Sequence, residues 1–461
     1  MIFAGRIKDE FNVESVISAA MESKIRECAD IYKGVPYWVD PDEHIKTINF
    51  SKSICSEIAR LATLGISIKF DGRARADWLQ ENIDKEFFNI RDWVEYACAY
   101  GTVVLKPSGN SIDLYTPGKF VVVDQEDGES TGMVFINQKY DNQEKKYYTK
   151  LEYHRFLKDG VYAVTNRCFV GETQNDAKTA IDITLTPWNG LLEEVYISNI
   201  TNPLFGVLRT PGANNIDIGC PLSLSVFSEA IEELKDLDIA YSRNAKEVYD
   251  SKRTLLLDSD RMVPTGKKVS DFVRDSDIVR KEMGLPDMVK NVYGDGASTF
   301  YQEINPSLDT EKRLAGINAL LSQIGYKCGF SNGYFVFNEK SGMVTATQVE
   351  SDDRRTIQFI KDVRDKLESC LDDVVYALNV FADLYYLAPV GVYEVAYDFG
   401  DITYNREEDR ARWYGYAMQN KIPFWYYLVK FEGMTEEEAK AMVAEAQPKE
   451  TMLFGGVSNG N

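Results

Sequence analysis

The sequence predicts an α+β protein built from several subdomains. Apolar residues recur with helical spacing near both ends of the chain, and short alternating strands fill residues 102–198. In addition, two long helical patterns bracket a short insert at residues 254–305. A chain of 461 residues is long enough for about two to four compact units of roughly 100–200 residues.

Residues 1–70 are expected to be mostly helical. Four apolar residues keep a rough helical period before the stop signal Gly65: Ile48, Ile54, Ile58 and Leu61. A second helical pattern covers residues 74–101 and is expected to break near Asn89. From Thr102 to about Ser198, short apolar runs alternate with Gly, Asn and Asp turns, which predicts an antiparallel sheet.

A connector rich in Asn, Pro and Gly at residues 199–222 leads into the first long helical pattern. Its stripe is Leu224, Phe227, Ile231, Leu234, Asp238, Tyr241, Ala245 and Val248. The pattern predicts a helix of about 30 residues, roughly 45 Å long. That length is unusual for a globular domain, where a helix averages about 11–12 residues.

The insert begins with an apolar strand at residues 254–258 and a turn at Pro264 and Gly266. A second helix is expected over residues 309–329. Its stripe is Leu314, Ile317, Leu321 and Ile324. Two helices that bracket a small insert predict antiparallel struts carrying a tip.

The stretch that begins at Gly342 leads into a third long helix, which is expected to continue to about Tyr386. Its stripe is Ile357, Ile360, Val363, Leu367, Leu371, Val374, Leu378 and Phe381. A strand at residues 394–402 and two short helices follow, one at residues 406–420 and one at residues 435–447. The last helix opens with a capping box, Thr435 with Glu438 three residues later.

The formal net charge of −20 argues against a protein that grips nucleic acid, because such a grip comes from Lys and Arg neutralising phosphates. The charge still allows a wall that DNA must slide past. The seven Cys are scattered without a CxxC pair, which favours a reducing compartment and buried thiols. No signal peptide and no apolar run of about 18 residues are evident, so the chain is expected to be soluble and intracellular.

The motifs that would carry catalysis are incomplete. Asp398-Phe399-Gly400 resembles a kinase motif, but the Gly-rich loop and the catalytic loop are missing. The glycines around residues 294–296 and the lysines Lys267 and Lys268 lack the rest of a nucleotide-binding loop. The only two histidines, His44 and His154, lie in unrelated contexts. We therefore expect no enzyme activity, no metal and no cofactor.

Pairs of acidic residues are the remaining chemical candidates, since such pairs can hold Mg²⁺ in a nuclease. They are Asp258 with Asp260, Asp275 with Asp277, and Asp352 with Asp353. Helix caps and solvated faces are the simpler interpretation in a chain this acidic. A metal-dependent nuclease nevertheless stays as one alternative.

Several blocks after residue 219 resemble the portal proteins of tailed bacteriophages, of the kind found in siphophages and in prophages of Gram-positive bacteria. The strongest are INPSL at residues 304–308, KCG with GYF at residues 327–335, and TATQV at residues 345–349. The last is similar to the family's TATEV motif, with Gln348 where Glu is common. The resemblance covers most of the chain and is weakest over residues 100–200.

The resemblance implies a virion protein that performs no bond chemistry. A homo-oligomeric ring, typically a dodecamer, would sit at one capsid vertex and form the channel for packaging and ejection of double-stranded DNA. Its partners would be the terminase large subunit, head–tail connector or adaptor proteins, and capsid and scaffold proteins, with no membrane. The ring would assemble in the host cytoplasm. Another phage or prophage head–tail ring protein is the second alternative.

The family's layout also assigns the segments of this chain. Residues 1–222 would form the wing, 223–252 and 306–328 the two stem helices, and 253–305 a small α/β clip. Residues 329–400 would hold the tunnel loop, a long tunnel or wing helix and a return strand. A helical crown would cover residues 401–450, before a C-terminal tail at 451–461.

By the same resemblance, a short loop and the start of the following helix would face the DNA channel. The residues are Asn338, Glu339, Lys340, Ser341, Gly342, Thr345, Thr347 and Gln348. Lys340 is the one basic residue of the loop and could touch phosphates transiently. In the clip, Lys267 and Lys268 are the corresponding candidates. An ordinary surface turn is the alternative interpretation of both.

Overall fold

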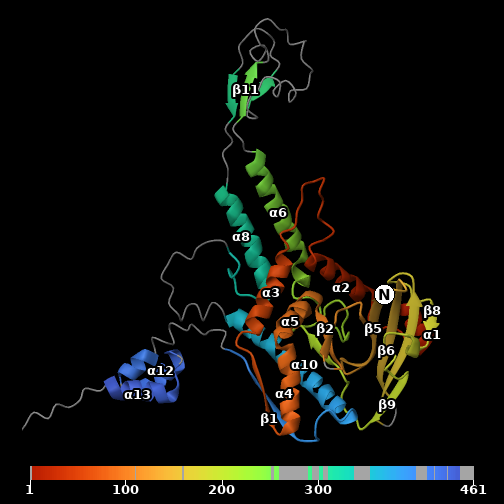
Figure 1. The fold of residues 1–461 in the computed structure, drawn as a ribbon. Coiled ribbons are helices and arrows are strands. Elements are labelled where there is room, and N and C mark those ends of the chain that lie inside the picture. The colour runs from red at the N-terminus through yellow and green to blue at the C-terminus, as the bar shows by residue number, and fades with distance from the viewer. Residues whose placement is uncertain are drawn as a thin grey trace, which may run out of the picture. The chain divides into compact units, whose positions relative to one another are not determined.

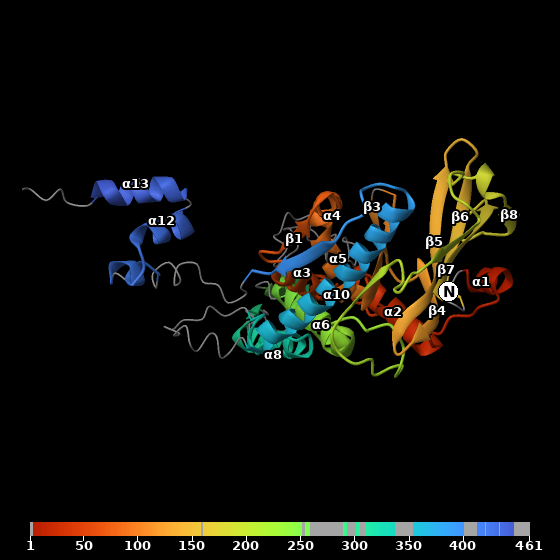
Figure 2. The same ribbon diagram turned by 90° about the horizontal axis from the view of Figure 1, so that it is seen from below.

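The computed structural model describes residues 3–109, 111–157, 160–250, 254–258, 289–292, 301–304, 310–336, 354–400, 413–419, 421–432 and 434–446. The architecture is α+β, as the sequence predicts. The chain divides into two compact units, Met1–Phe399 and Gly400–Asn461. Figure 1 and the turned view in Figure 2 show the elements of each unit.

The chain begins with three helices, α1 (Ala4–Phe11), α2 (Ala19–Tyr32) and α3 (Phe50–Ala62), which confirms the helical start. The hydroxyl of Ser18 caps α2 by accepting a hydrogen bond from the backbone N–H of Met21. Helix α1 packs on the larger sheet through Ile7, and α2 buries Met21 against the smaller one.

The break predicted near Asn89 is present. Helix α4 (Ala74–Glu86) leads into a short 3₁₀ turn, η1 (Phe87–Asn89), and α5 (Ile90–Tyr100) continues in a new direction. Helix α5 packs against α3, so the first half of the chain forms a helical layer beside the sheets.

The antiparallel sheet predicted from residue 102 is confirmed and consists of two sheets. The larger has the order β4-β5-β6-β7-β8, with β9 also paired to β7. Its strands are β4 (Phe120–Glu126), β5 (Glu129–Asp141), β6 (Lys146–Phe156), β7 (Val161–Gly171), β8 (Thr179–Ile181) and β9 (Glu194–Ser198), with a 3₁₀ turn η3 (Ile183–Leu185). All its pairings are antiparallel.

The smaller sheet, β10 (Gly206–Arg209), β2 (Thr102–Ser108) and β3 (Ser111–Tyr115), has β2 at its centre. A core of Phe135, Phe205 and Val104 joins the two sheets. Strand β10 lies so close to helix α10 (Arg354–Leu384) that a Cβ on Gly206 would be 2.4 Å from the carbonyl oxygen of Cys370. Glycine is needed there because no side chain fits.

The first of the long helices is shorter than the sequence pattern suggests. Helix α6 (Ile231–Asp250) has 20 residues and follows a 3₁₀ turn, η4 (Ser228–Ala230). The residues before α6 make hydrogen bonds to other elements instead of extending the helix. The backbone N–H of Val226 donates to the carbonyl of Cys98 in α5, and that of Ser223 donates to the hydroxyl of Thr102 at the start of β2.

The second helix of the pair, α8 (Thr310–Lys327), and the long helix α10 agree with their predicted positions. Between α6 and α8 the chain forms a three-stranded sheet. Strand β11 (Thr254–Asp258) is central, parallel to β12 (Val289–Val292) and antiparallel to β13 (Tyr301–Ile304). The strand predicted at residues 254–258 is thus confirmed.

Helix α10 runs for 31 residues, about 46 Å at 1.5 Å per residue. The buried guanidinium of Arg364 donates to the carbonyls of Leu61 and Ala62 and so binds α10 to the end of α3. After α10 the chain returns as strand β14 (Tyr393–Asp398), which pairs with β1 (Ser67–Gly72).

The second unit contains helices α12 (Phe424–Glu432) and α13 (Glu436–Ala446). The capping box is confirmed, because Thr435 and Glu438 exchange side-chain to backbone hydrogen bonds. Helix α12 was not predicted; its core is aromatic and includes Tyr427 and Phe431. Among the described residues of both units, no helix is long and apolar enough to cross a membrane.

Candidate functional site

The residues predicted to face a DNA channel lie outside the described part of the chain. They are Asn338, Glu339, Lys340, Ser341, Gly342, Thr345, Thr347 and Gln348. The clip residues Lys267 and Lys268 also lie outside it. The structure therefore does not test where these residues lie. The described elements on either side of them are the helices α6, α8 and α10.

The two described ends of the predicted channel loop are tied to each other. Ser331, shortly before the loop, donates its backbone N–H to the hydroxyl of Thr356 at 2.8 Å, and both side chains are buried. A Cβ on Gly329, whose φ is +92°, would be 2.5 Å from the ring of Phe359. The described residues that precede and follow 337–353 thus form one tightly packed contact.

Helices α6 and α8 lie side by side and antiparallel (Figure 1). Near one end, Lys327 of α8 forms an ion pair with Glu233 of α6 at 2.5 Å; near the other, Arg313 pairs with Glu247. Between them the helices bury Leu234 and Leu237 on α6 and three residues of the predicted stripe on α8, namely Ile317, Leu321 and Ile324. We call α6 and α8 together the helix pair.

The inner side of the helix pair is fixed to the rest of the unit by a buried carboxylate. Asp238 accepts hydrogen bonds from the indole N–H of Trp38 at 2.9 Å and from the backbone N–H of Ile48 at 3.0 Å. One turn later, the hydroxyl of Ser242 accepts from the N–H of Lys46 and donates to its carbonyl. The polar interruption of the apolar stripe at Asp238 is the sequence signal for this contact.

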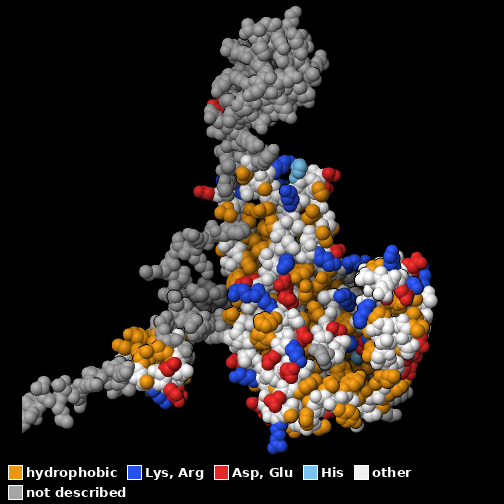
Figure 3. Space-filling model, viewed as in Figure 1, with side chains coloured by type: hydrophobic (Ala, Val, Ile, Leu, Met, Phe, Trp, Pro, Cys, Tyr) orange, Lys and Arg blue, Asp and Glu red, His pale blue; other side chains and the backbone are white. Residues whose placement is uncertain are grey.

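The outer side of the helix pair exposes large apolar residues. Tyr241 and Val248 on α6 are 48% and 54% exposed, and Leu314 and Tyr326 on α8 are also exposed. Figure 3 shows apolar side chains gathered over these helices on the face in view. The helical stripes, which include Tyr241, Val248 and Leu314, are typical of core or of a self-association surface, and these three residues are exposed in a single copy. Exposed aromatic and aliphatic residues of this kind are typical of association surfaces.

The two helices differ in charge. Helix α6 carries six acidic and three basic side chains, whereas α8 carries one acidic and three basic. The inequality leaves α6 net acidic and α8 net basic. Two of the three basic residues of α8, Arg313 and Lys327, pair with Glu247 and Glu233 of α6, so this difference in charge holds the two helices of one copy together.

The described residues offer little for catalysis. They contain no group of three or more His, Cys, Asp and Glu that could hold a metal ion. Of the acidic pairs considered as nuclease ligands, only Asp258 is described, at the end of β11; its companion and both members of the other pairs lie outside. Burial raises the pKa of all seven cysteines, so their thiols stay protonated and are poor nucleophiles.

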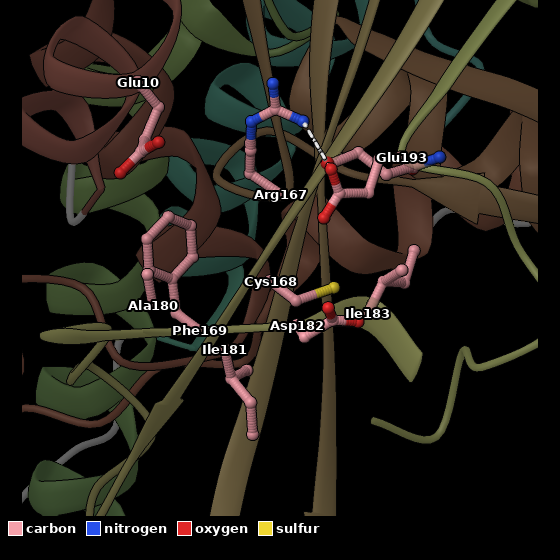
Figure 4. A pocket seen from close by; sticks show the side chains of 10 residues that line it. Glu10, Arg167, Cys168, Phe169, Ala180, Ile181, Asp182, Ile183 and Glu193 are labelled. Atoms are coloured by element: carbon pink, nitrogen blue, oxygen red, sulfur yellow. Dashed lines mark hydrogen bonds and ion pairs between the residues drawn. The ribbon is translucent and has the colours of Figure 1, made fainter. Parts of the chain in front are cut away.

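A cavity of about 260 Å³ lies beside strand β7 (Figure 4). Its one cationic side chain, Arg167, is already paired with Glu194 at 2.9 Å and with Glu193 at 3.9 Å. Asn166 also lines the cavity, and its buried Oδ1 accepts no hydrogen bond from a described residue.

A buried network of charged residues joins the two sheets. Glu152 on β6 accepts from Lys106 at 2.8 Å, Lys150 at 2.6 Å and the Nε2–H of His154 at 2.8 Å. The hydroxyl of Tyr162 lies 3.0 Å from Nδ1 of His154 and so donates to it. Sequence reasoning did not single out this network.

The pKa values in the network follow from burial opposed by close charges. Burial alone would raise the pKa of Glu152, but Lys106, His154 and Lys150 outweigh it and hold that pKa well below its usual range. Burial lowers the pKa of His154, which therefore stays neutral near pH 7. The network is closed on itself and buried, so we interpret it as structural.

The comparisons with known proteins give no assignment. No protein-family model matches the chain, and a search of curated proteins gave no significant match.

Proposed function

We propose that this chain is a portal protein of a tailed bacteriophage, which assembles into a ring at one capsid vertex. The ring would form the channel for packaging and ejection of double-stranded DNA. It would also bind the terminase large subunit and the head–tail connector proteins, with capsid and scaffold proteins around it. The observation that carries the proposal is the helix pair: two antiparallel helices that bracket a separate small sheet and expose apolar residues on their outer side.

The exposed residues of the helix pair support ring closure. A closed ring of identical copies uses heterologous contacts, so each copy needs two different, complementary faces. Helices α6 and α8 each expose large apolar residues and so offer two different faces within one element. The exposed aromatic and aliphatic residues would supply the buried apolar area of each contact.

The anchored loop supports a channel. A segment whose two ends are fixed by Ser331 and Thr356 can approach DNA while its base keeps its place in the ring. The net charge of −20 also suits a passage for DNA. A wall with more acidic than basic residues holds a duplex weakly and lets it move.

Deletion of residues 338–342 tests the proposed channel role. We expect rings of normal size, because the loop's base remains, but reduced DNA filling of the capsids. The measurement is the amount of DNase-protected DNA per particle when the variant replaces the natural protein in a packaging system. The control replaces the turn residues 142–145 of the β5–β6 hairpin by glycine, which should leave DNA filling unchanged. Normal filling by the deletion variant would refute the loop's placement in the channel.

The function as a whole is tested by imaging the purified protein in negative stain. Flanged rings with a central hole are the expected result. A different phage ring protein would also give rings, but it would not restore DNA packaging to particles that lack a portal, and that complementation distinguishes the two.

A further inference from the structure

In the two-stranded ribbon of β1 and β14, the outer backbone groups of one strand are hydrogen-bonded and those of the other strand are not. Helix α4 packs on β1, and its residue Gln80 closes the outer edge of that strand. The side chain of Gln80 accepts from the N–H of Phe70 at 3.1 Å and donates to the carbonyl of Ile68 at 3.1 Å. A side-chain amide thus makes the hydrogen bonds that a third strand would make.

The opposite edge of the ribbon belongs to β14. In an antiparallel pair, successive residues direct their backbone groups alternately toward and away from the partner strand. Since Ile68 and Phe70 direct theirs outward to Gln80, their register partners Tyr397 and Val395 direct theirs outward on the other side. Tyr393 follows by the same alternation. No described residue donates to or accepts from these outward backbone groups.

The exposed face of the ribbon is acidic. Glu394 lies directly opposite Asp71 in the register, a like-charge pair that destabilises a sheet unless a cation lies nearby. Asp398 lies further along the same face, and Lys69 is its one basic residue. Among the described residues, none forms an ion pair with any of these three carboxylates.

The chain just before β14 is held in place by a fully buried arginine. Arg75 donates to the carbonyls of Asn379, Ala388 and Pro389 and forms an ion pair with Asp383 at 2.5 Å. The segment so held carries Tyr386 and Val390, which are 92% and 88% exposed. Its fixed conformation lowers the entropy lost when a partner binds beside it.

We propose that the outer edge of β14 binds an extended segment of another protein, which adds a third strand to the ribbon. The segment has Lys or Arg at alternate positions, to meet Glu394, Asp398 and Asp71, and apolar residues between them. Main-chain hydrogen bonds to Tyr393, Val395 and Tyr397 supply affinity, and the carboxylates select the charge. Self-pairing of two β14 strands is disfavoured because it would bring the acidic residues of both copies together. This proposal rests on the ribbon alone and not on the ring.

The test uses a fluorescein-labelled peptide of alternating valine and lysine as the probe, with the purified full-length protein. We expect saturable binding in fluorescence anisotropy. Val395→Pro removes one outward N–H and should weaken binding by about tenfold or more, whereas the matched variant Val395→Thr keeps the N–H and should bind normally. Replacing both Glu394 and Asp398 by lysine should transfer the preference to a valine–glutamate peptide.

Hydrogen exchange at single-residue resolution gives an independent readout. The amides of Glu394 and Ala396 should exchange slowly with or without the peptide, because they bond to β1. Those of Val395 and Tyr397 should slow only when the peptide is bound. Binding that is equal in Val395→Pro and Val395→Thr, or protection of all these amides without peptide, would overturn the proposal. Protection that rises with protein concentration alone would assign the edge to a second copy and so contradict the proposed partner.

Discussion

The charged network of the sheets and the surface of the helix pair contrast sharply. In the sheets, Glu152 lies among two lysines and a histidine, and each charge has partners at 2.6–2.8 Å within the same chain. On the outer side of the helix pair, Tyr241 and Val248 stay about half exposed. The charged network is buried and paired within the chain, whereas the outer side of the helix pair leaves large apolar side chains at the surface.

The comparison separates a region that stabilises a single copy, the charged network, from a region suited to contact another molecule, the outer side of the helix pair. A buried ionic network contributes to a fixed internal structure, and breaking it is costly. Partly exposed aromatic and aliphatic residues contribute less to the stability of a single copy, because they bury less apolar area. We therefore expect substitutions in the two regions to separate stability from assembly.

The largest expected effect comes from Glu152→Ala. It would leave Lys106 and Lys150 buried without their shared carboxylate, so we expect the free energy of unfolding to fall by about 3–5 kcal/mol. Urea denaturation followed by circular dichroism measures it. The matched control is Glu144→Ala, which removes an exposed partner of Lys146 and should cost about 0.5 kcal/mol or less. Equal effects of the two substitutions would show that the network is not what stabilises the sheets.

The next effect concerns the inner side of the helix pair. Asp238→Ala leaves the indole N–H of Trp38 and the N–H of Ile48 without their acceptor. We expect a loss of about 2–3 kcal/mol, together with faster hydrogen exchange in α6 than in the strands. A loss spread evenly over helices and sheets would mean that Asp238 does not hold this particular contact.

Acid should weaken the sheets in two stages. The pKa of His154 is lowered by burial, so the unfolded chain binds its proton more readily, and stability should begin to fall as pH drops below about 6.5. The pKa of Glu152 is also lowered, so its contribution is present above about 4.5, the value for the unfolded chain, and is lost as pH falls further. Urea midpoints from pH 8 down to about pH 2 measure both stages. In His154→Gln the first stage should disappear; if it persists unchanged, another group titrates there.

The smallest effect on stability, with the clearest effect on assembly, is expected for Tyr241→Ser. Because Tyr241 is 48% exposed, its loss should change the free energy of unfolding by about 0.5 kcal/mol or less. The variant should nevertheless assemble less completely in mass photometry. Tyr140, 47% exposed on β5, is the matched control, and Tyr140→Ser should assemble normally. Equal assembly of both variants would exclude the outer side of α6 as a contact.

The sequence pattern predicted the strands, the break near Asn89, the capping box and the helix that the structure describes as α10, because these depend on local periodicity and turn residues. It overestimated α6, since the hydrogen bonds of Ser223 and Val226 to distant residues stop the helix from starting earlier. It also gave no sign of the charged network. Lys150, Glu152 and His154 alternate as on a solvated strand face. Groups distant in the sequence, among them Lys106 and Phe205, cover that face and make it an interior.

The helix pair also shows what the sequence pattern cannot predict. Tyr241, Val248 and Leu314 fit the apolar stripes, which are typical of core or of a self-association surface, and a single copy exposes them. Periodicity identifies an apolar face but does not say whether the same chain or a neighbouring copy covers it. The predicted channel residues, including Lys340, lie outside the described residues and remain predictions.

The most direct test of the account is a density map of the purified, assembled protein by electron cryo-microscopy. We predict a closed ring in which α6 of each copy packs along α8 of the next, around a hole wide enough for a DNA duplex. A protein that stays monomeric under all conditions, or a ring whose helix pairs make no contact between copies, would contradict it.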